Sequence, residues 1–131
     1  MSNEKVFATA KDIKQGRYIM IDEIPCRVAD IETSKSGKHG GAKMRITGIG
    51  VFDGQKKVLL SPGDSEVEVP IIDRKNAQIM SVSGKTAQVM DSQTYEIYDI
   101  EVPEELLPGA VAGKEAEILE AMGRKKIERI K

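Results

Sequence analysis

Short β-type segments separated by turn residues constrain the fold of this sequence more than any other feature. Residues 17–21 and 24–28 are rich in β-branched and aromatic residues and flank the acidic pair Asp22-Glu23, which predicts a hairpin. From Ala42 to Gly48, small and apolar residues alternate with Lys43, Arg45 and Thr47, the period of a half-buried strand. A further strand is expected at 57–60, between turns at 52–55 and 61–64. About five strands in roughly the first 70 residues predict a small closed barrel, because closure removes exposed sheet edges.

The pattern of short strands begins again after Pro70. Strands are expected at 77–82, 86–90 and 95–100, with a turn at Ser83-Gly84-Lys85. Proline is a poor residue for a central strand, so Pro70 is the expected boundary. We therefore expect two domains, residues 1–69 and 70–131.

The stretch from Gly113 to Gly123 is ambiguous in secondary structure. It is rich in helix formers, and propensity alone predicts a helix. Glycines bound it, however, and residues 124–130 could pair with it as a final hairpin, which favours a strand. A helical turn is expected at 103–107, where Pro103 suits the first turn and two glutamates follow it.

Composition excludes several classes of protein. Charged residues make up 31% and hydrophobic residues 40% of the 131 residues, which is typical of a soluble globular protein. The longest aliphatic run, Val58-Leu59-Leu60, is far too short to cross a membrane. Residues 1–7 contain Glu4 and Lys5 and no apolar signal segment, so we expect a cytoplasmic protein with no membrane partner.

The single cysteine and the single histidine limit the chemistry. Cys26 has no partner for an intramolecular disulfide or a cysteine zinc site, and we expect it to be a small buried hydrophobe. His39 alone cannot form a histidine-rich metal site, and it is the only possible base for a Ser-His-Asp arrangement. We expect no metal site, and a hydrolytic enzyme is disfavoured.

A glycine-rich basic segment lies between two expected strands. Gly37, Gly40 and Gly41 allow sharp turns with positive φ, which would present Lys38 at the tip. Residues 32–47 carry a local charge of +3 on a chain of net charge -1. This pattern suits a local contact with phosphates, and it equally suits a solvated loop with incidental lysines. The residues alone leave both interpretations open.

Two catalytic interpretations of this segment fail. Gly37-Lys38 and Gly84-Lys85-Thr86 each match part of a phosphate-binding P-loop, but Glu32 and Ile79 stand where the leading glycine is required. A nucleophilic lysine is also disfavoured, because exposed lysines are mostly protonated at neutral pH and no apolar pocket is evident.

The segment from Ser34 to Lys43 closely resembles the hypusine loop of the translation initiation factor 5A family. The resemblance extends to Ile24-Pro25-Cys26-Arg27-Val28, to Val69-Pro70 and to residues 121–126. The Gly40-Gly41 pair looks more archaeal than eukaryotic. The resemblance implies an all-β fold, with an N-terminal SH3-like barrel followed by a C-terminal OB-fold barrel of the nucleic-acid-binding type. It also implies a strand at 113–123.

The resemblance assigns the post-translational modification to Lys38. In that family, deoxyhypusine synthase uses NAD to oxidise spermidine transiently and transfers its aminobutyl group to this lysine, so this chain would be a substrate, with no catalytic residue and no bound cofactor. Gly37, His39 and Gly40 match the positions beside the modified lysine, and Lys35 and Lys43 match flanking basic positions. Ser36 and Gly41 depart from the eukaryotic pattern, which weakens any expectation of later hydroxylation from deoxyhypusine to hypusine.

The expected function follows from the family. The factor would bind the ribosome beside peptidyl-tRNA and promote peptide-bond formation, including at proline runs, with Lys35, Lys43 and Arg45 as supporting RNA contacts. The alternative is a general RNA-binding module that uses an unmodified basic loop and the OB-fold. Against RNA binding by the C-terminal half, that half is net acidic, and its only aromatics, Tyr95 and Tyr98, are expected to be core or partly buried residues.

Overall fold

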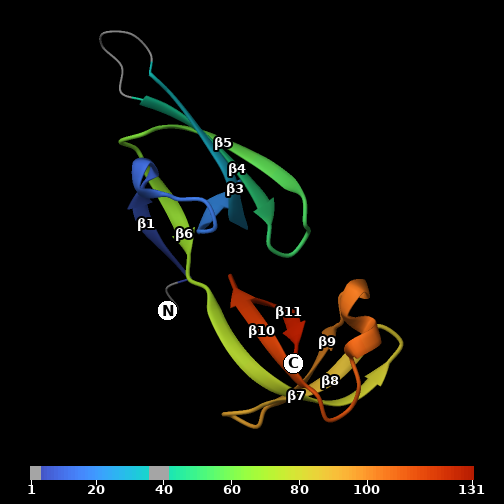
Figure 1. Cartoon of the computed structure of the whole chain (residues 1–131). Coiled ribbons are helices and arrows are strands. Elements are labelled where there is room, and N and C mark those ends of the chain that lie inside the picture. The colour runs from blue at the N-terminus through green and yellow to red at the C-terminus, as the bar shows by residue number, and fades with distance from the viewer. Residues whose placement is uncertain (1–3, 36–41) are drawn as a thin grey trace. The chain divides into compact units, whose positions relative to one another are not determined.

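The computed structural model describes residues 4–35 and 42–131, and the chain divides into two compact units. The first unit runs to Ile71 and the second starts at Ile72. Each unit is built from antiparallel strands that curl around a core of its own (Figure 1).

The first unit contains two sheets. One has the order β2-β3-β4-β5, and the other pairs β1 with β6, which packs beside β2. The 3₁₀-helix η1, Ala10–Asp12, follows β1. The strands are β1 Lys5–Thr9, β2 Tyr18–Ile21, β3 Ile24–Lys35, β4 Ala42–Gly50, β5 Lys56–Pro62 and β6 Glu66–Pro70.

The hairpin expected around Asp22-Glu23 is confirmed. Ile21 pairs with Ile24, which leaves Asp22 and Glu23 as a two-residue turn with φ values of 51° and 66°. Positive φ at both central positions is typical of the type I′ turn, whose twist matches that of the flanking strands. β1 was not predicted, because its only partner among the described strands, β6, is remote in sequence.

The core of the first unit lies inside the curled β2-β3-β4-β5 sheet. β4 alternates as expected, with Met44 and Ile46 buried and Lys43 and Arg45 exposed. Cys26 is fully buried beside them, as predicted, and burial raises the pKa of its thiol. The buried core residues are Ala10, Ile13, Ile19, Ile21, Cys26, Val28, Met44, Ile46 and Val67.

The second unit is one five-stranded sheet with the order β11-β10-β7-β8-β9. Its edge strands β9 and β11 approach each other, so the sheet curls into a barrel. The 3₁₀-helix η2, Glu104–Gly109, links β9 to β10 and confirms the expected helical turn. The strands are β7 Asp73–Ser83, β8 Thr86–Asp91, β9 Ile97–Glu101, β10 Glu115–Ala121 and β11 Arg124–Ile130.

The ambiguous stretch is strand β10, and it forms a hairpin with β11. Ala116 and Ile118 point into the core of the second unit, and β10 is hydrogen-bonded to both β7 and β11. Tertiary pairing therefore overrides the helix propensity of this segment. The core residues are Ala77, Ile79, Ala87, Val89, Ile100, Val102, Ala110, Ala116, Ile118 and Ile127.

Tyr95 corrects two expectations. It lies in the turn before β9 rather than in the strand, with a φ of 63°, and it is 70% exposed rather than buried. The turn is held by the Asp91 carboxylate, which no propensity scale reports. Tyr98, by contrast, is partly buried as expected and packs against the core.

No helix among residues 4–35 and 42–131 is long and apolar enough to cross a membrane. Within those same ranges, no group of three or more His, Cys, Asp or Glu side chains could hold a metal ion.

Candidate functional site

The strands that flank the glycine-rich segment form a long hairpin. β3 and β4 pair from Cys26 opposite Gly50 as far as Lys35 opposite Ala42. Residues 36–41 connect the two strands directly after this last pair. The predicted site residues Gly37, Lys38, His39 and Gly40 lie outside the described residues.

The predicted basic residues Lys43 and Arg45 lie on the outward face of this hairpin. Both side chains are exposed, and they alternate with the buried Met44. Across the sheet, Lys43 lies opposite Ser34 of β3 and Pro62 of β5. Lys35 is the last residue of β3, so its backbone adjoins the same end of the hairpin. Three of the predicted residues are thus brought to one end of the sheet.

A shallow groove of about 560 Å³ lies over this end of the sheet. Two cations, Lys43 and Arg45, and one carboxylate, Glu32 opposite Arg45, line it. Leu60 adds apolar surface, because it lies opposite Arg45 on the other side and is 74% exposed. Such a surface can hold a polyanion through charge and pack sugar or base surfaces against its apolar part. The groove is lined by Glu32, Thr33, Ser34, Lys43, Met44, Arg45, Leu60, Ser61 and Pro62.

β4 packs closely against the core of the first unit, and this packing supports the hairpin. Gly48 of β4 faces the core, where an added Cβ would lie 2.8 Å from the Cβ of Cys26 and 3.0 Å from the Cδ1 of Ile21. Glycine is therefore required for β4 to approach this part of the core. The pairing of β3 with β4 also shifts by one residue between Val28 and Asp30, and a β-bulge of this kind bends and twists a strand.

Sequence reasoning missed the apolar part of this face. Ile49, Val58 and Leu60 are 37%, 37% and 74% exposed, and all three side chains point outward. The sequence did contain an indication, because alternate residues of β5 (Lys56, Val58 and Leu60) must share one face of the sheet. The residues of β4 that lie opposite them, however, are known only from the strand register.

Comparison with known proteins places the chain among translation factors. Residues 4–65 match the family model described as translation initiation factor 5A-like, N-terminal. Translation initiation factor 5A of Archaeoglobus fulgidus is 48% identical over 120 residues, which covers 92% of this chain and 94% of that protein. The protein of the same name from Methanocaldococcus jannaschii is 48% identical over 118 residues, covering 90% of this chain and 89% of that protein.

Solved structures agree with this result. The eukaryotic translation initiation factor 5A from Methanococcus jannaschii matches with a TM-score of 0.92 and 44% identity, covering 100% of this chain and 98% of that one. A family protein from Naegleria fowleri matches with a TM-score of 0.82 and 30% identity, covering 98% and 99%. The fold is therefore the expected one, an SH3-like barrel followed by an OB-fold barrel. The chain belongs to the translation initiation factor 5A family, of archaeal type, and its role is in translation.

Proposed function

We propose that this protein binds the ribosome beside peptidyl-tRNA and promotes peptide-bond formation, including at proline runs, through a hypusine or deoxyhypusine side chain at Lys38. The observation that carries the proposal is the basic outward face of β4, with Lys43 and Arg45 exposed next to the segment that contains Lys38. Family membership supports the assignment of the modified residue.

The chemistry of the arm suits a positioning role. Transfer of the aminobutyl group breaks its C–N bond in spermidine, releases the remaining part as 1,3-diaminopropane and forms a C–N bond to the ε-nitrogen of Lys38. This keeps one amine at that nitrogen and adds a second at the tip. Two cationic centres on a longer arm can contact phosphates and 2′-hydroxyls of the tRNA acceptor end. Holding the acceptor end in place accelerates peptide-bond formation where orientation of the reacting groups limits the rate.

The other parts of the proposal follow from this role. The protein is itself not an enzyme; it is a cytoplasmic substrate of deoxyhypusine synthase and holds no bound cofactor. The exposed Lys43 and Arg45, with Lys35 at the end of the paired strand β3, would supply supporting contacts to RNA.

Mass analysis of protein purified from its native cells tests the modification. Intact mass and peptide mapping are expected to show an aminobutyl group on Lys38 and none on Lys35 or Lys43, which serve as internal controls. An unmodified Lys38 would instead favour a general RNA-binding module that uses the basic face alone. Protein made in a host without the synthase provides the unmodified reference.

A further inference from the structure

The outward face of β7, β8 and β9 in the second unit gathers exposed apolar side chains. Gln78 of β7 lies opposite Met90 of β8, and Met90 lies opposite Ile97 of β9, so the three share one face of the sheet. A shift in pairing between Ile79 and Ser81 leaves Met80 unpaired on the exposed side. Met80 is 42% and Ile97 is 54% exposed. We call this set, completed by Gln88, Asp99 and Glu101, the acidic face.

The negative charge of the acidic face disfavours binding to nucleic acid. Its outward residues Asp99 and Glu101 are exposed carboxylates. No lysine or arginine occurs in β8, in β9 or in residues 77–83, the part of β7 that pairs with β8; Arg74 and Lys75 lie in the earlier part of β7, opposite β10. Binding to phosphates requires cations, so a surface of this composition repels the RNA backbone. Apolar side chains bordered by carboxylates are instead complementary to apolar and basic groups of a protein.

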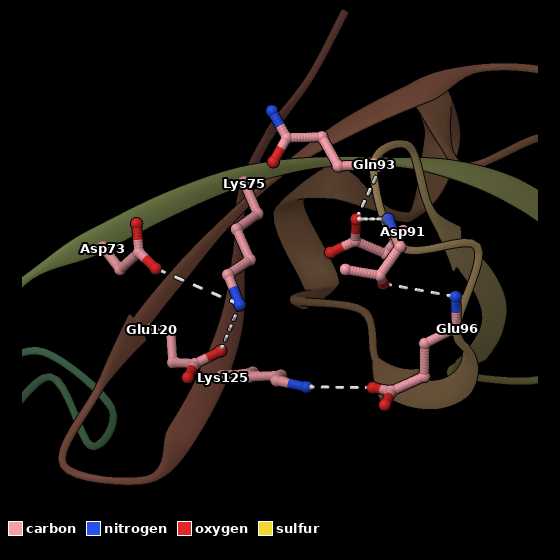
Figure 2. A network of polar contacts seen from close by, with 8 residues as sticks. Asp73, Lys75, Asp91, Gln93, Glu96, Glu120 and Lys125 are labelled. Atoms are coloured by element: carbon pink, nitrogen blue, oxygen red, sulfur yellow. Dashed lines mark hydrogen bonds and ion pairs between the residues drawn. The ribbon is translucent and has the colours of Figure 1, made fainter. Parts of the chain in front are cut away.

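The loop at one end of the acidic face is held in a fixed conformation. One oxygen of the Asp91 carboxylate accepts the backbone N–H groups of Gln93 and Thr94, at 2.8 and 2.9 Å (Figure 2). The Thr94 hydroxyl accepts the N–H of Glu96 at 3.3 Å. At the far end of the loop, Lys125 of β11 lies 3.8 Å from the Glu96 carboxylate, as Figure 2 also shows.

These contacts present Tyr95 to solvent. Its backbone has a positive φ of 63°, which is costly for a tyrosine and persists only where the surroundings impose it. The ring is 70% exposed and belongs to the turn that leads directly to Ile97. An exposed tyrosine on an ordered loop loses little entropy on binding and can accept a guanidinium group on its face.

We propose that the acidic face and Tyr95 form a docking surface for a protein segment that carries arginine or lysine side chains next to apolar ones. The proposal rests on the proposed function, because the partner is met on the ribosome, and it assigns the second unit to a protein component rather than to RNA. Met80, Met90 and Ile97 bury the apolar part of the partner, and methionine side chains adapt to irregular surfaces. Asp99 and the Tyr95 ring receive its cations.

Site-specific photo-crosslinking on purified ribosomes identifies what covers the face. Full-length modified protein carries benzoylphenylalanine in place of Ile97, and a second variant carries it in place of Arg45 on the first unit. From position 97, we expect an adduct that resists ribonuclease, is lost on protease treatment, and maps to a basic and apolar peptide of a ribosomal protein. An adduct to RNA from position 97 overturns the proposal, as does an adduct from position 45 with none from 97.

Affinity measurements separate this inference from the proposed function. Ile97→Asp is expected to weaken ribosome binding about tenfold or more, as loss of an interface anchor does. Val111→Asp is the matched control, because Val111 is 49% exposed and lies outside the three strands. If Ile97→Asp binds as tightly as Val111→Asp, the inference fails while the proposed function stands. If the wild-type protein does not bind ribosomes, both fail.

Discussion

The outward face of β3, β4 and β5 carries Lys43 and Arg45 beside Leu60, whereas the outward face of β7, β8 and β9 carries Asp99 beside Ile97 and Met80. Both faces belong to sheets of antiparallel strands, and both leave apolar side chains exposed. They differ in the sign of their charge. Because burial alone cannot distinguish RNA from protein as a partner, the charge beside the apolar groups is the ground on which we propose RNA for the first face and protein for the second.

The largest loss of activity is expected from replacing Lys38, the proposed modification site, which has no counterpart in the second unit. Lys38→Arg keeps one positive charge but removes the amine that we propose accepts the aminobutyl group, so modification should be abolished. We expect a loss of about hundredfold in peptide-bond formation at proline runs, the scale on which mispositioned reactants slow a reaction. The measurement is synthesis of a proline-run peptide by purified ribosomes. Lys43→Arg is the control and should retain nearly full activity; comparable activity of the two variants would refute the role of Lys38.

The next effect tests whether the basic face depends on its supporting core. Gly48→Ala forces a methyl group against Cys26 and Ile21, and such overpacking costs about 1–3 kcal/mol. The first unit should therefore unfold at lower denaturant concentration, as measured by urea denaturation followed by hydrogen exchange in each unit. Gly109→Ala is the matched control in the second unit, since an added Cβ there meets no atom within 4 Å. Equal stability of the two variants would show that β4 can move away from Cys26.

A smaller effect measures the charge difference directly. Replacing Lys43 and Arg45 together with alanine should weaken binding of a single-stranded oligoribonucleotide and reduce its salt slope by about 0.7 for each phosphate that the protein no longer neutralises. Asp99→Asn on the acidic face should leave the salt slope unchanged. Fluorescence anisotropy at several salt concentrations gives both values. A larger loss of affinity from Asp99→Asn than from the double replacement would reverse the assignment of RNA to the first face.

The pattern of burial explains which elements could be predicted from the sequence. β4 was predictable because one face is buried, so Met44 and Ile46 alternate with Lys43 and Arg45. β10 was not predictable from propensity, because its helix formers are held by pairing with β7 and β11. β1 was also not predicted, because it is held by pairing with β6, a segment remote in sequence.

The residues of the two candidate sites also differ in how far they could be predicted from the sequence. Lys38 was singled out by resemblance to a family motif, since a lysine among glycines in a sequence has no physical signature of its own. Met80 was missed because a one-residue shift in the pairing of β7 with β8 leaves it on the exposed side. Ile97 was missed because its place on the same face follows only from its pairing with Met90 of β8. The position of Tyr95 depends on the Asp91 carboxylate, and the order Asp-Ser-Gln-Thr at 91–94 could have indicated a side-chain-capped turn.

The smallest effect concerns the loop that presents Tyr95. Hydrogen bonds from the N–H groups of Thr94 and Gln93 lower the pKa of Asp91 below its usual value of 3.8. A carboxyl group with a lowered folded-state pKa stabilises the fold above its unfolded pKa, and this contribution is lost as the pH falls below 3.8 toward the folded value.

Asp91→Asn keeps an oxygen that can accept a hydrogen bond but cannot titrate. The variant should be slightly less stable at neutral pH, and its second unit should lose less stability than wild type between pH 5 and pH 2, about the range over which native carboxylates protonate. Thermal unfolding at a series of pH values measures both changes, with Asp99→Asn on the neighbouring strand as the control. If Asp91→Asn and wild type show the same acid dependence, the Asp91 carboxylate does not hold the loop, and the fixed presentation of Tyr95 on the acidic face needs another cause.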